Sequence, residues 1–497
     1  MKIKTIILVC TPIVLVGCAL LGPDYKKPNV DTPKAWQESS SNTQTIESSV
    51  NLSDTSWWNR FNDATLNQLI DEALANNNDI QSAIGNISVA ASNLQLVNMA
   101  WVPTVNLGGS ASTGSTFNSS NSSSNPLINN LATASGNSIS GNNNFNFYSG
   151  GLIPSYSINI FQQLKKTDVA KANLSQAKAT KDAVRLTVIS QVCGSYFTLI
   201  ALNKQLTQQK QLVNHLETLL NLVKIQYKYG IATLNDVQTY QQKLSETKMQ
   251  TPNIEHNIVV AQNALQVLIN KNPNKFINLN DFDKISTQGV IPINLPSTVL
   301  RNRPDIHMAE EQLIMANANI GVATANFFPH LSLTTPIGGY NAQLGSLLSG
   351  NSDFWAAQIT AVMPILNLGI NSLIKEAKGQ YYIAYYNYVK SIKNAFADVN
   401  NNLSGYSSIQ STYNEANVLY NSAYTSATLS TLNYKKGYIS YPDSLSNLIT
   451  QDNYSIILTQ TKLQELQGII SLYQSLAGGY NYKNTEKLKK FNDEHDV

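Results

Sequence analysis

Two stretches of the chain, residues 163–228 and 369–436, contain no proline and place apolar residues at helical spacing. A periodic pattern longer than about 25 residues is typical of a coiled coil or a helical repeat. At 1.5 Å per residue, each stretch would form a helix about 100 Å long, far longer than a globular domain is wide. The sequence therefore predicts two long helices that need packing partners along their length. In the first, the apolar positions include Leu199, Leu202, Leu206, Leu212, Leu216, Leu219 and Val223.

Shorter helical patterns accompany each long stretch. Two of them, each about 55 Å long, would match the first long helix when placed end to end. Asp63 and Asn235 are the residues that we expect to cap these two helices at their amino ends. The four ranges are 64–100 and 233–270 around the first long stretch, and 300–326 and 444–480 around the second.

Four short segments alternate apolar residues with small polar ones, as half-exposed strands do. This pattern suits strands of a membrane β-barrel with a wet lumen, and equally a four-stranded soluble sheet with one solvated face. Pro154 and Pro364 weaken two of the strand predictions, because proline donates no ladder hydrogen bond. The apolar positions are Val105 and Leu107; Tyr156, Ile158 and Ile160; Leu331 and Leu333; and Ile359, Ala361 and Met363.

The two halves of the chain repeat one plan: short helix, strand, loop, strand, long helix, turn, short helix. The segment Tyr227–Asp236 matches Tyr434–Asp443 at an offset of 207 residues, with Tyr, Lys, Gly and Asp in register. Likewise, Trp101-Val-Pro parallels Phe327-Phe-Pro. The sequence therefore contains an internal twofold repeat.

The two repeats differ in length only between their strands. The interval from Pro103 to Phe161 is 58 residues, whereas that from Pro329 to Asn367 is 38. The long helical stretches that follow keep their length. In the longer connection, residues 118–144 include nine Asn and eight Ser, which predicts a long solvated loop.

One chain offers only four strands. The smallest closed barrels need about eight, and lipid does not tolerate open sheet edges. If the strands are membranous, the protein must therefore oligomerise, as a dimer with eight strands or a trimer with twelve.

The amino terminus has the pattern of a bacterial export signal. A basic start, Met1-Lys-Ile-Lys4, precedes an apolar run from Ile6 to Val16 that is too short to be a spanning helix. Leu15-Val-Gly-Cys18 resembles a lipobox, in which Cys18 is diacylated and becomes the first mature residue. The alternative is an ordinary signal peptide with an incidental cysteine. By the same resemblance, Ala19 favours the outer membrane.

Only one thiol then remains in the mature chain. Cys10 leaves with the signal and Cys18 carries lipid, so Cys193 cannot form an internal disulfide. Its apolar neighbours predict a buried structural thiol.

Charge is scarce. Charged residues make up 13% of the chain against about 25% in average soluble proteins, and the net charge of +3 falls to about +1 without Lys2 and Lys4. A nucleic-acid binder needs a basic face, so that class is excluded. A helical membrane protein is also excluded, because no run after residue 20 approaches 18 apolar residues.

Signatures of an enzyme are missing from the sequence. It contains no Gly-x-x-x-x-Gly-Lys-Ser/Thr phosphate loop, no Gly-x-Ser-x-Gly elbow and no His-Glu-x-x-His zinc helix. The five histidines are scattered, at positions 215, 256, 307, 330 and 495. We therefore expect neither a catalytic residue nor a cofactor nor a metal site.

Three motifs, taken with the repeat, resemble the TolC-like outer membrane factors, the outer-membrane channels of RND-type efflux systems, and in particular their lipoprotein branch. The resemblance spans nearly the whole mature chain, although each motif alone is weak. The motifs are Gly22-Pro-Asp-Tyr-Lys-Lys-Pro28; Leu300-Arg-Asn-Arg-Pro-Asp-Ile306; and Ala309-Glu-Glu-Gln-Leu with Ala316-Asn-Ala-Asn-Ile-Gly321 and Phe327-Phe-Pro329.

The resemblance implies a mainly α fold with membrane β-strands. A trimer would share one twelve-stranded outer-membrane β-barrel, with four strands per protomer, above a periplasmic α-barrel of long helices. Together with the repeat, the resemblance divides the chain into six parts. They are a signal peptide (1–17), a lipid anchor with an amino-terminal equatorial segment (18–62), repeat 1 (63–270), an equatorial insertion (271–299), repeat 2 (300–480) and a tail (481–497). The strand pairs lie at 101–161 in repeat 1 and at 328–367 in repeat 2.

The turns after the long helices are the candidate functional site. Gly230 and Gly437 are placed to end those helices with a left-handed residue. The resemblance puts the turns at the periplasmic tip, where Tyr434 and Asp443, and Asp236 in the first repeat, match residues that close the pore. The alternative is that these residues are solvated helix ends.

The chain departs from the family's gate in two places. Ile439 stands where the family often has arginine, and Ser446 replaces a second acid. These departures put a salt-bridged gate in doubt, although Lys228, Lys435 and Lys436 could substitute.

The Arg303-Pro304-Asp305 sequence predicts a structural helix start, because proline suits the first turn and aspartate suits the positive end of the helix dipole.

The prediction for function is a passive exit duct in the bacterial outer membrane, opened by a periplasmic adaptor and an inner-membrane pump. The main alternative is a lipid-anchored periplasmic coiled-coil adaptor or scaffold without a pore; an ordinary porin would lack the long helices.

Overall fold

The computed structural model describes residues 22–31, 55–115, 144–273, 279–287, 300, 302–341, 343–347 and 353–481. These fall into two compact units, one made mainly of residues 92–171 and 314–382, the other mainly of 26–91, 172–313 and 383–497. The predicted signal peptide, Cys18, almost all of the Asn- and Ser-rich segment and most of the tail lie outside the described residues.

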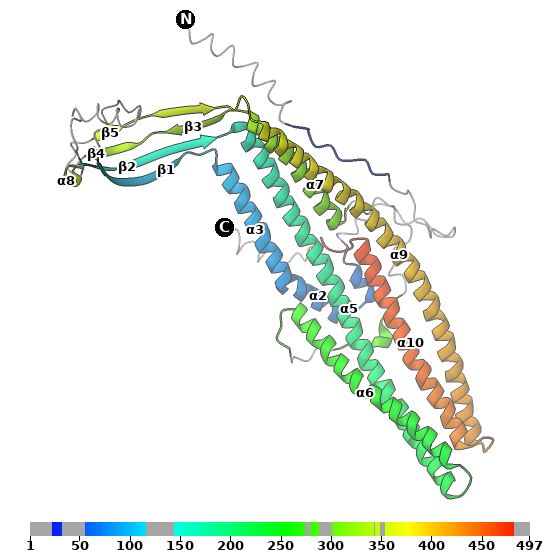
Figure 1. The fold of residues 1–497 in the computed structure, drawn as a ribbon. Helices are drawn as coiled ribbons and strands as arrows, with labels where there is room; N and C mark the ends of the chain where they lie inside the picture. Colours follow the sequence, from blue (N-terminus) through cyan, green and yellow to red (C-terminus); the bar gives the residue numbers. More distant parts are fainter. Residues whose placement is uncertain are drawn as a thin grey trace. The chain divides into compact units, whose positions relative to one another are not determined.

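Long helices dominate the described chain (Figure 1). The two longest are α5 (Ile160–Lys228) and α9 (Leu368–Lys435). The shorter ones are α2 (Ala64–Asn76), α3 (Asn78–Met99), α6 (Leu234–Leu268), α7 (Pro304–Thr324) and α10 (Tyr441–Ser475), with a one-turn α8 (Leu344–Leu347). Short 3₁₀ turns are η2 (Trp57–Phe61), η3 (Phe282–Lys284) and η5 (Ala325–Phe327).

Residues 64–100 form two helices where the sequence predicts one. Asn77 is the reason. Its backbone is extended, and its side-chain oxygen accepts hydrogen bonds from the backbone N–H of Asp79 (2.9 Å) and Ile80 (3.2 Å). An asparagine that satisfies free amides in this way caps a new helix, so α2 ends and α3 begins there.

Part of α5 is more apolar than expected from the sequence, where no run after residue 20 approaches 18 apolar residues. Within the described residues, α5 alone contains an 18-residue window long and apolar enough to cross a membrane by length and composition. More than half of that window, 56%, is buried inside the protein. Val192, Cys193, Tyr196 and Phe197 are fully buried there, and burial raises the pKa of the Cys193 thiol. The window is therefore explained by a packed core.

Aromatic rings fix the start of repeat 1 against that core. Trp57 stacks on Tyr473 of α10 with ring centroids 4.5 Å apart, and Phe61 meets Phe197 of α5 edge to face at 4.8 Å. Next to them, Asp63 caps α2 by accepting from two backbone amides. The second oxygen of Asp63 accepts from the Tyr196 hydroxyl at 2.6 Å.

The strands form one antiparallel sheet. Its strands are β1 (Thr104–Ser115), β2 (Asn144–Ile158), β3 (His330–Thr334), β4 (Ile337–Asn341), β5 (Asp353–Trp355) and β6 (Gln358–Val362). β2 pairs with β1 on one side and with β3 and β4 on the other, β3 pairs with β6, and β4 pairs with β5. Two of the four predicted strands are therefore each interrupted, the first at Pro336.

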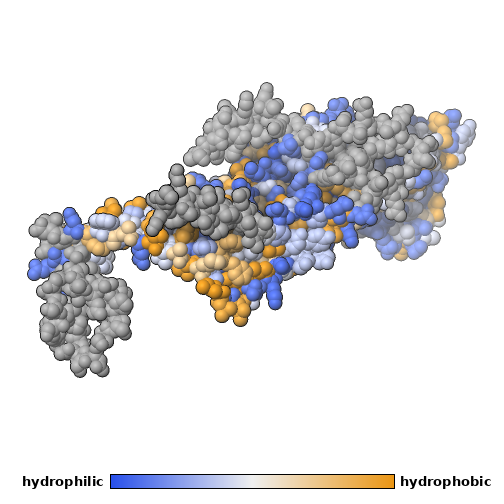
Figure 2. Space-filling view, turned by 90° about the horizontal axis from the view of Figure 1, so that it is seen from above, coloured by the Kyte–Doolittle hydropathy of each residue, from blue (hydrophilic) through white to orange (hydrophobic). Residues whose placement is uncertain are grey.

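The register places the predicted apolar strand residues on one face, whereas Ile153 and Val362 lie on the other. Leu107 lies opposite Leu152, which lies opposite Ile337; Tyr156 lies opposite Leu333, which lies opposite Ile359. Most of these side chains stay exposed in the single chain, with Leu107 at 83% and Ile359 at 79%, whereas Tyr156 is half-buried and Ile158 is buried (Figure 2 shows orange surface on the strands). Ile160, predicted on this face, instead begins α5.

The opposite face carries small polar groups. Its cross-strand hydrogen bonds join Thr104 to Ser155 (2.9 Å), Ser110 to Ser149 (2.7 Å) and Ser157 to His330 (2.7 Å). Cross-strand pairs of this kind stabilise a sheet without apolar cover. One face of the sheet thus suits an apolar solvent and the other suits water.

The segment after the predicted lipid anchor runs against α7. The φ of Gly22 is +96°, and a Cβ there would lie 3.1 Å from the Cα of Gly321. Asn317 donates to the carbonyl of Pro23 (2.8 Å), and Lys27 pairs with Glu310 (2.6 Å). The motif Gly22–Pro28 therefore packs against the motif that runs from Ala309 to Gly321, and the two form one contact.

Glycines let β2 and β4 approach closely. Gly151 lies opposite Gly338, and a Cβ on Gly151 would lie 2.6 Å from the Cα of Gly338 and closer still to the carbonyl oxygen of Ile337. Beside them, a Cβ on Gly109 or Gly150 would make only ordinary contacts, at 3.6 and 3.9 Å.

We predict that Gly151→Ala and Gly338→Ala each destabilise the sheet by about 1–3 kcal/mol, the usual cost of overpacking. The matched controls are Gly150→Ala, one residue away in β2, and Gly109→Ala, which lies opposite Gly150 in β1. The guanidinium midpoint of the purified protein is the measurement. Equal midpoints for all four variants would contradict the close approach.

Candidate functional site at the two helical turns

The turns after α5 and α9 have the same geometry. Gly230 and Gly437 have φ of +73° and +78°. In the first turn, the N–H of Ile231 donates to the carbonyl of Gln226 (2.8 Å); in the second, that of Tyr438 donates to Asn433 (2.9 Å). The N–H of each glycine donates to the carbonyl three residues earlier. Both turns are therefore Schellman motifs, and they lie 207 residues apart in the sequence.

Each following helix starts with a hydroxyl N-cap, which in α6 is part of a capping box. The backbone N–H of Asp236 donates to Thr233 Oγ1 (3.2 Å), while Asp236 Oδ2 accepts from the N–H of Thr233 (2.8 Å). In repeat 2, the N–H of Asp443 donates to Ser440 Oγ (3.3 Å), whose hydroxyl donates back to Asp443 Oδ2 (2.5 Å). The N-cap of α6 is thus Thr233 and not the predicted Asn235, because a capping side chain must stand three residues before the amide it accepts from.

The two acids therefore have a local structural role. Asp443 is exposed and Asp236 is half-buried, and the hydrogen bonds from Thr233 lower the pKa of the Asp236 carboxyl, which keeps it ionised. Within the part of the chain that the structure describes, neither acid forms an ion pair with Lys228, Lys435 or Lys436. A single chain thus leaves their outward charge available.

Tyr434 lies beside the second turn. Its ring stacks on that of Tyr441, with centroids 4.8 Å apart and 30° between the planes. The stack joins the last turn of α9 to the first turn of α10. Ile439 is half-buried within this turn, and Ser446 is exposed on α10. The structure thus brings Tyr434 and Asp443 to one turn, and Asp236 to the equivalent turn of repeat 1.

An apolar core supports the first turn. It joins α5, α6 and α10 and contains Leu212, Leu216, Leu219, Leu220, Val223, Val237, Leu244, Leu445 and Ile449. Leu445 and Ile449 come from α10, so this core links repeat 1 to repeat 2 close to both turns.

A polar layer that the sequence analysis missed lies next to this core. Asp452 of α10 is 5% exposed; its two oxygens contact His215 Nδ1 (2.6 Å) and Gln211 Nε2 (3.0 Å) of α5. Gln208 of α5 donates to the hydroxyl of Thr459 (2.9 Å). Nothing in the local sequence of α5 distinguishes these polar residues from the others on its surface, because their partners are more than 230 residues away.

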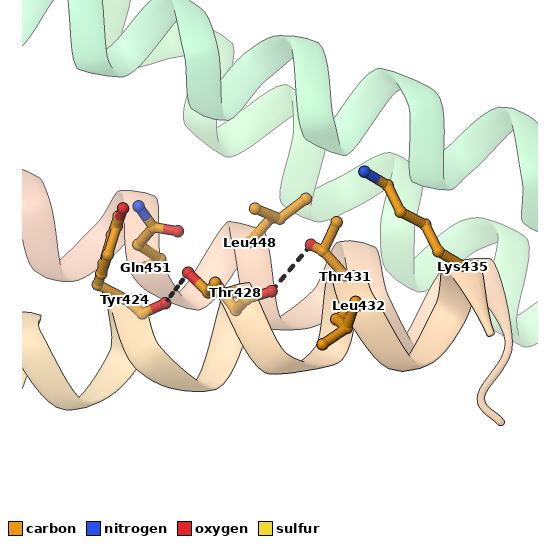
Figure 3. A pocket seen from close by; sticks show the side chains of 8 residues that line it. Tyr424, Thr428, Thr431, Leu432, Lys435, Leu448 and Gln451 are labelled. Carbon is orange, nitrogen blue, oxygen red and sulfur yellow. Dashed lines mark hydrogen bonds between the residues drawn. The ribbon is translucent and has the colours of Figure 1, made fainter.

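An open groove of about 430 Å³ runs between α9 and α10 near the second turn (Figure 3). Tyr424, Thr428, Thr431 and Lys435 of α9 face it, and Leu448 and Gln451 of α10 complete its wall. The threonine hydroxyls bond carbonyls one turn back in their own helix, Thr428 to Tyr424 and Thr431 to Ala427. The groove therefore presents methyl groups, one aromatic ring and a lysine.

Arg303 lies far from the turns. It donates two hydrogen bonds to Asp305 (3.0 and 2.7 Å), one to the carbonyl of Ser475 (2.7 Å) and one to Asp398 (3.2 Å). Burial lowers the pKa of Arg303, but the two carboxylates outweigh it and raise the pKa. With Pro304 at the first position of α7, Arg303 ties that helix to α9 and to the carboxyl end of α10. The turn residues stand at the other end of α10, about 50 Å away along the helix.

No metal site emerges among the described residues, where no group of three or more His, Cys, Asp or Glu side chains could hold an ion.

The family described as outer membrane efflux protein matches the chain twice, at residues 69–271 and 295–478. The chain is similar to the cation efflux system protein CusC of Escherichia coli K12 (28% identity; 95% of this chain and 98% of that protein) and to the probable outer membrane lipoprotein SilC of Salmonella typhimurium (27%; 95% and 98%). Among solved structures, the Campylobacter jejuni CmeC outer membrane channel has the same fold, with a TM-score of 0.77 at 23% identity over 96% of this chain and 98% of that one.

Removing the Thr233 hydroxyl should weaken the first turn of α6. Loss of an N-cap costs about 1 kcal/mol, which corresponds to about fivefold faster hydrogen exchange of the first-turn amides. Thr239→Ala is the matched control, because the Thr239 hydroxyl bonds the carbonyl of Asn235 inside the same helix. Equal exchange rates in Thr233→Ala and Thr239→Ala would contradict the capping box.

Proposed function

Because the chain belongs to the outer membrane efflux protein family and is the outer-membrane channel of an efflux system rather than an enzyme, we propose that three copies form one passive exit duct. Drugs or other small solutes leave through the shared lumen without chemistry in this chain. An inner-membrane pump supplies the energy, and a periplasmic adaptor joins pump to duct.

The sheet is the observation that carries this proposal. In all four strand segments most apolar residues lie on one largely exposed face, and most hydroxyls lie on the other, which also carries apolar exceptions such as Ile153 and Val362. A lipid-facing and a water-facing side are what a pore wall requires. Within the described residues, β1 pairs only with β2, and β6 only with β3. Open edges are costly in lipid, so copies must pair edge to edge, and three copies give a twelve-stranded barrel.

Exposed apolar residues on the helices support the same assembly. α6 exposes Met249, Val259, Val260 and Val267, and α9 exposes Ile383, Tyr386, Val418 and Leu419. A soluble monomer seldom exposes rows of large apolar side chains on long helices. In the trimer these rows become the seams between neighbouring protomers of the periplasmic α-barrel.

The turns form the periplasmic gate of this duct. Three copies of Asp236, Tyr434 and Asp443 around one axis make a ring of acids and aromatics that attracts cations and repels anions. The groove beside Thr428 and Lys435 is the surface that a helical adaptor would engage, since it lies between the two helices that must separate for the gate to open.

Cys18 is the lipid attachment site in this proposal. It lies four residues before Gly22, which is seated on α7, so the chain can place the attachment point at most about 14 Å from that contact. The anchor is then fixed to the same unit as the strands, and several acyl chains hold it in the outer membrane.

Planar-bilayer conductance combined with the mass of the detergent-extracted particle tests the duct. A trimer mass with stable single-channel steps is the expected result. A soluble, non-conducting monomer after removal of the lipid would overturn the duct and favour a lipid-anchored adaptor or scaffold.

We predict that Asp236→Asn and Asp443→Asn together reduce cation selectivity and relieve block by multivalent cations. Asparagine keeps an acceptor for the capping box, so the change isolates charge. Asp79→Asn, an acid in the first turn of α3, is the control. Unchanged selectivity and block in the double variant would mean that these acids do not line the axis.

A further inference from the structure

Residues 279–287, referred to below as the clasp, bind three other parts of the chain. Asn280 donates to Asp63 Oδ1 (2.6 Å), the same carboxylate that caps α2. Phe282 and Ile285 are buried. Asp283 pairs with Lys204 of α5 (2.5 Å). A nine-residue segment with almost no regular structure is thus held by one buried carboxylate, two apolar side chains and an ion pair.

Lys462 of α10 adds a second cation beneath the clasp. Its ammonium donates to the carbonyl oxygens of Phe282 (3.0 Å) and Asp283 (3.2 Å) and lies 5.1 Å from the centre of the Phe282 ring. A lysine in this position satisfies carbonyls that a 3₁₀ turn leaves free and also gains a cation–π contact. The clasp is therefore attached to α10 through its backbone and to α5 through a side chain.

Glu465, one turn further along α10, does not fit this pattern of satisfied contacts. It is 3% exposed, and its Oε2 is buried without a hydrogen-bond partner among the described residues. Its other polar contact is with Thr287, at the end of the clasp. A buried carboxylate with an unpartnered oxygen is costly when ionised and far less costly when protonated.

The groups that face Glu465 come from three elements. Lys462 lies on its own helix, and Thr287 and Asp283 belong to the clasp. Tyr406 and Tyr413 of α9 lie close enough to sense its charge, and Gly468 of α10 allows Ile409 and Tyr406 of α9 to approach. Lys462 is therefore the one cation among these neighbours, and its charge favours the ionised form of Glu465, against the effect of burial.

We propose that the clasp is a pH-sensitive restraint, which holds α5, α10 and the start of α2 together while Glu465 is protonated and loosens when Glu465 loses its proton.

The direction follows from burial. Desolvation raises the pKa of Glu465 above its ordinary value of 4.5, more than Thr287 and Lys462 lower it. A carboxyl whose folded-state pKa is raised adds stability that is fully present below its unfolded pKa and is lost as pH rises through the folded pKa. Lys462 responds in the opposite sense, because burial lowers its pKa, so a variant of Glu465 alone is needed to isolate the effect.

The consequence for transport rests on the proposed duct. α10 carries the second turn at one end and is gripped by the clasp nearer the other, so the clasp limits how far α10 can shift against α5. With the same pump and adaptor bound, a duct whose clasp is loosened should have a higher open probability.

Hydrogen-exchange mass spectrometry of the full-length protein, at about pH 5.5 and about pH 8, tests the clasp directly. Rates are corrected for the intrinsic pH dependence of exchange. In the wild type, opening of residues 279–287 should increase with pH by up to about tenfold per unit of raised pKa. Glutamine has the shape of a protonated glutamate but cannot ionise. In Glu465→Gln, the increase of clasp opening with pH should therefore disappear.

Two variants serve as controls. Glu255→Gln removes an exposed carboxylate of α6 that pairs with Lys210, and it should behave as the wild type. Lys204→Gln breaks the clasp ion pair and should raise exchange of the clasp at both pH values by a similar factor, which proves that the assay detects loosening.

Equal pH responses in the wild type and Glu465→Gln would overturn the clasp inference, whatever the channel does. Bilayer recordings separate the two proposals: a protein that never conducts at either pH refutes the duct alone. A duct whose open probability rises with pH in the wild type, but not in Glu465→Gln, supports both.

Discussion

A helix as long as α5 persists only if packing continues along its whole length, because an isolated helix gains little from its own hydrogen bonds in water. This constraint explains why the neighbours of α5 change along the chain. Phe61 and the Asp63 cap contact it at Phe197 and Tyr196, the clasp contacts it at Lys204, and α10 contacts it at Gln211 and His215. The other elements are arranged as successive partners of this helix.

The sheet differs from α5, because it is ordered with little apolar packing against it. Within the described residues most of its apolar face is exposed, so the register of the strands is set with little core beneath them. Cross-strand pairs supply the order instead: serine and threonine hydroxyls bond on one face, and Gly151 and Gly338 remove the side chains where β2 and β4 approach most closely. In the proposed duct, lipid covers one face of this sheet and other copies of the chain cover its edges.

The turns illustrate how one residue can have two roles. Asp236 closes a capping box and Asp443 accepts a hydrogen bond from the capping hydroxyl of Ser440, and these contacts alone would explain an acid at this position in both repeats. The capping bond uses one carboxylate oxygen from one side, so the charge still faces outward. A ring of three such acids would therefore need no residue beyond those that the helix start already requires.

The sequence by itself determined the elements whose signal is local or repeated. Helical periodicity and the alternation of the strand segments come from neighbouring residues, the repeat is visible as an offset of 207 residues, and the family resemblance rests on short motifs such as Gly22–Pro28 and Leu300–Ile306. Only the tertiary structure decided the break at Asn77, the cap at Thr233 and the interruption at Pro336, because several nearby residues could each have filled those positions. It also decided the contacts of Asp452 and Glu465. Their partners are distant in sequence, and a buried acid on a helix looks like any surface acid until the chain is folded.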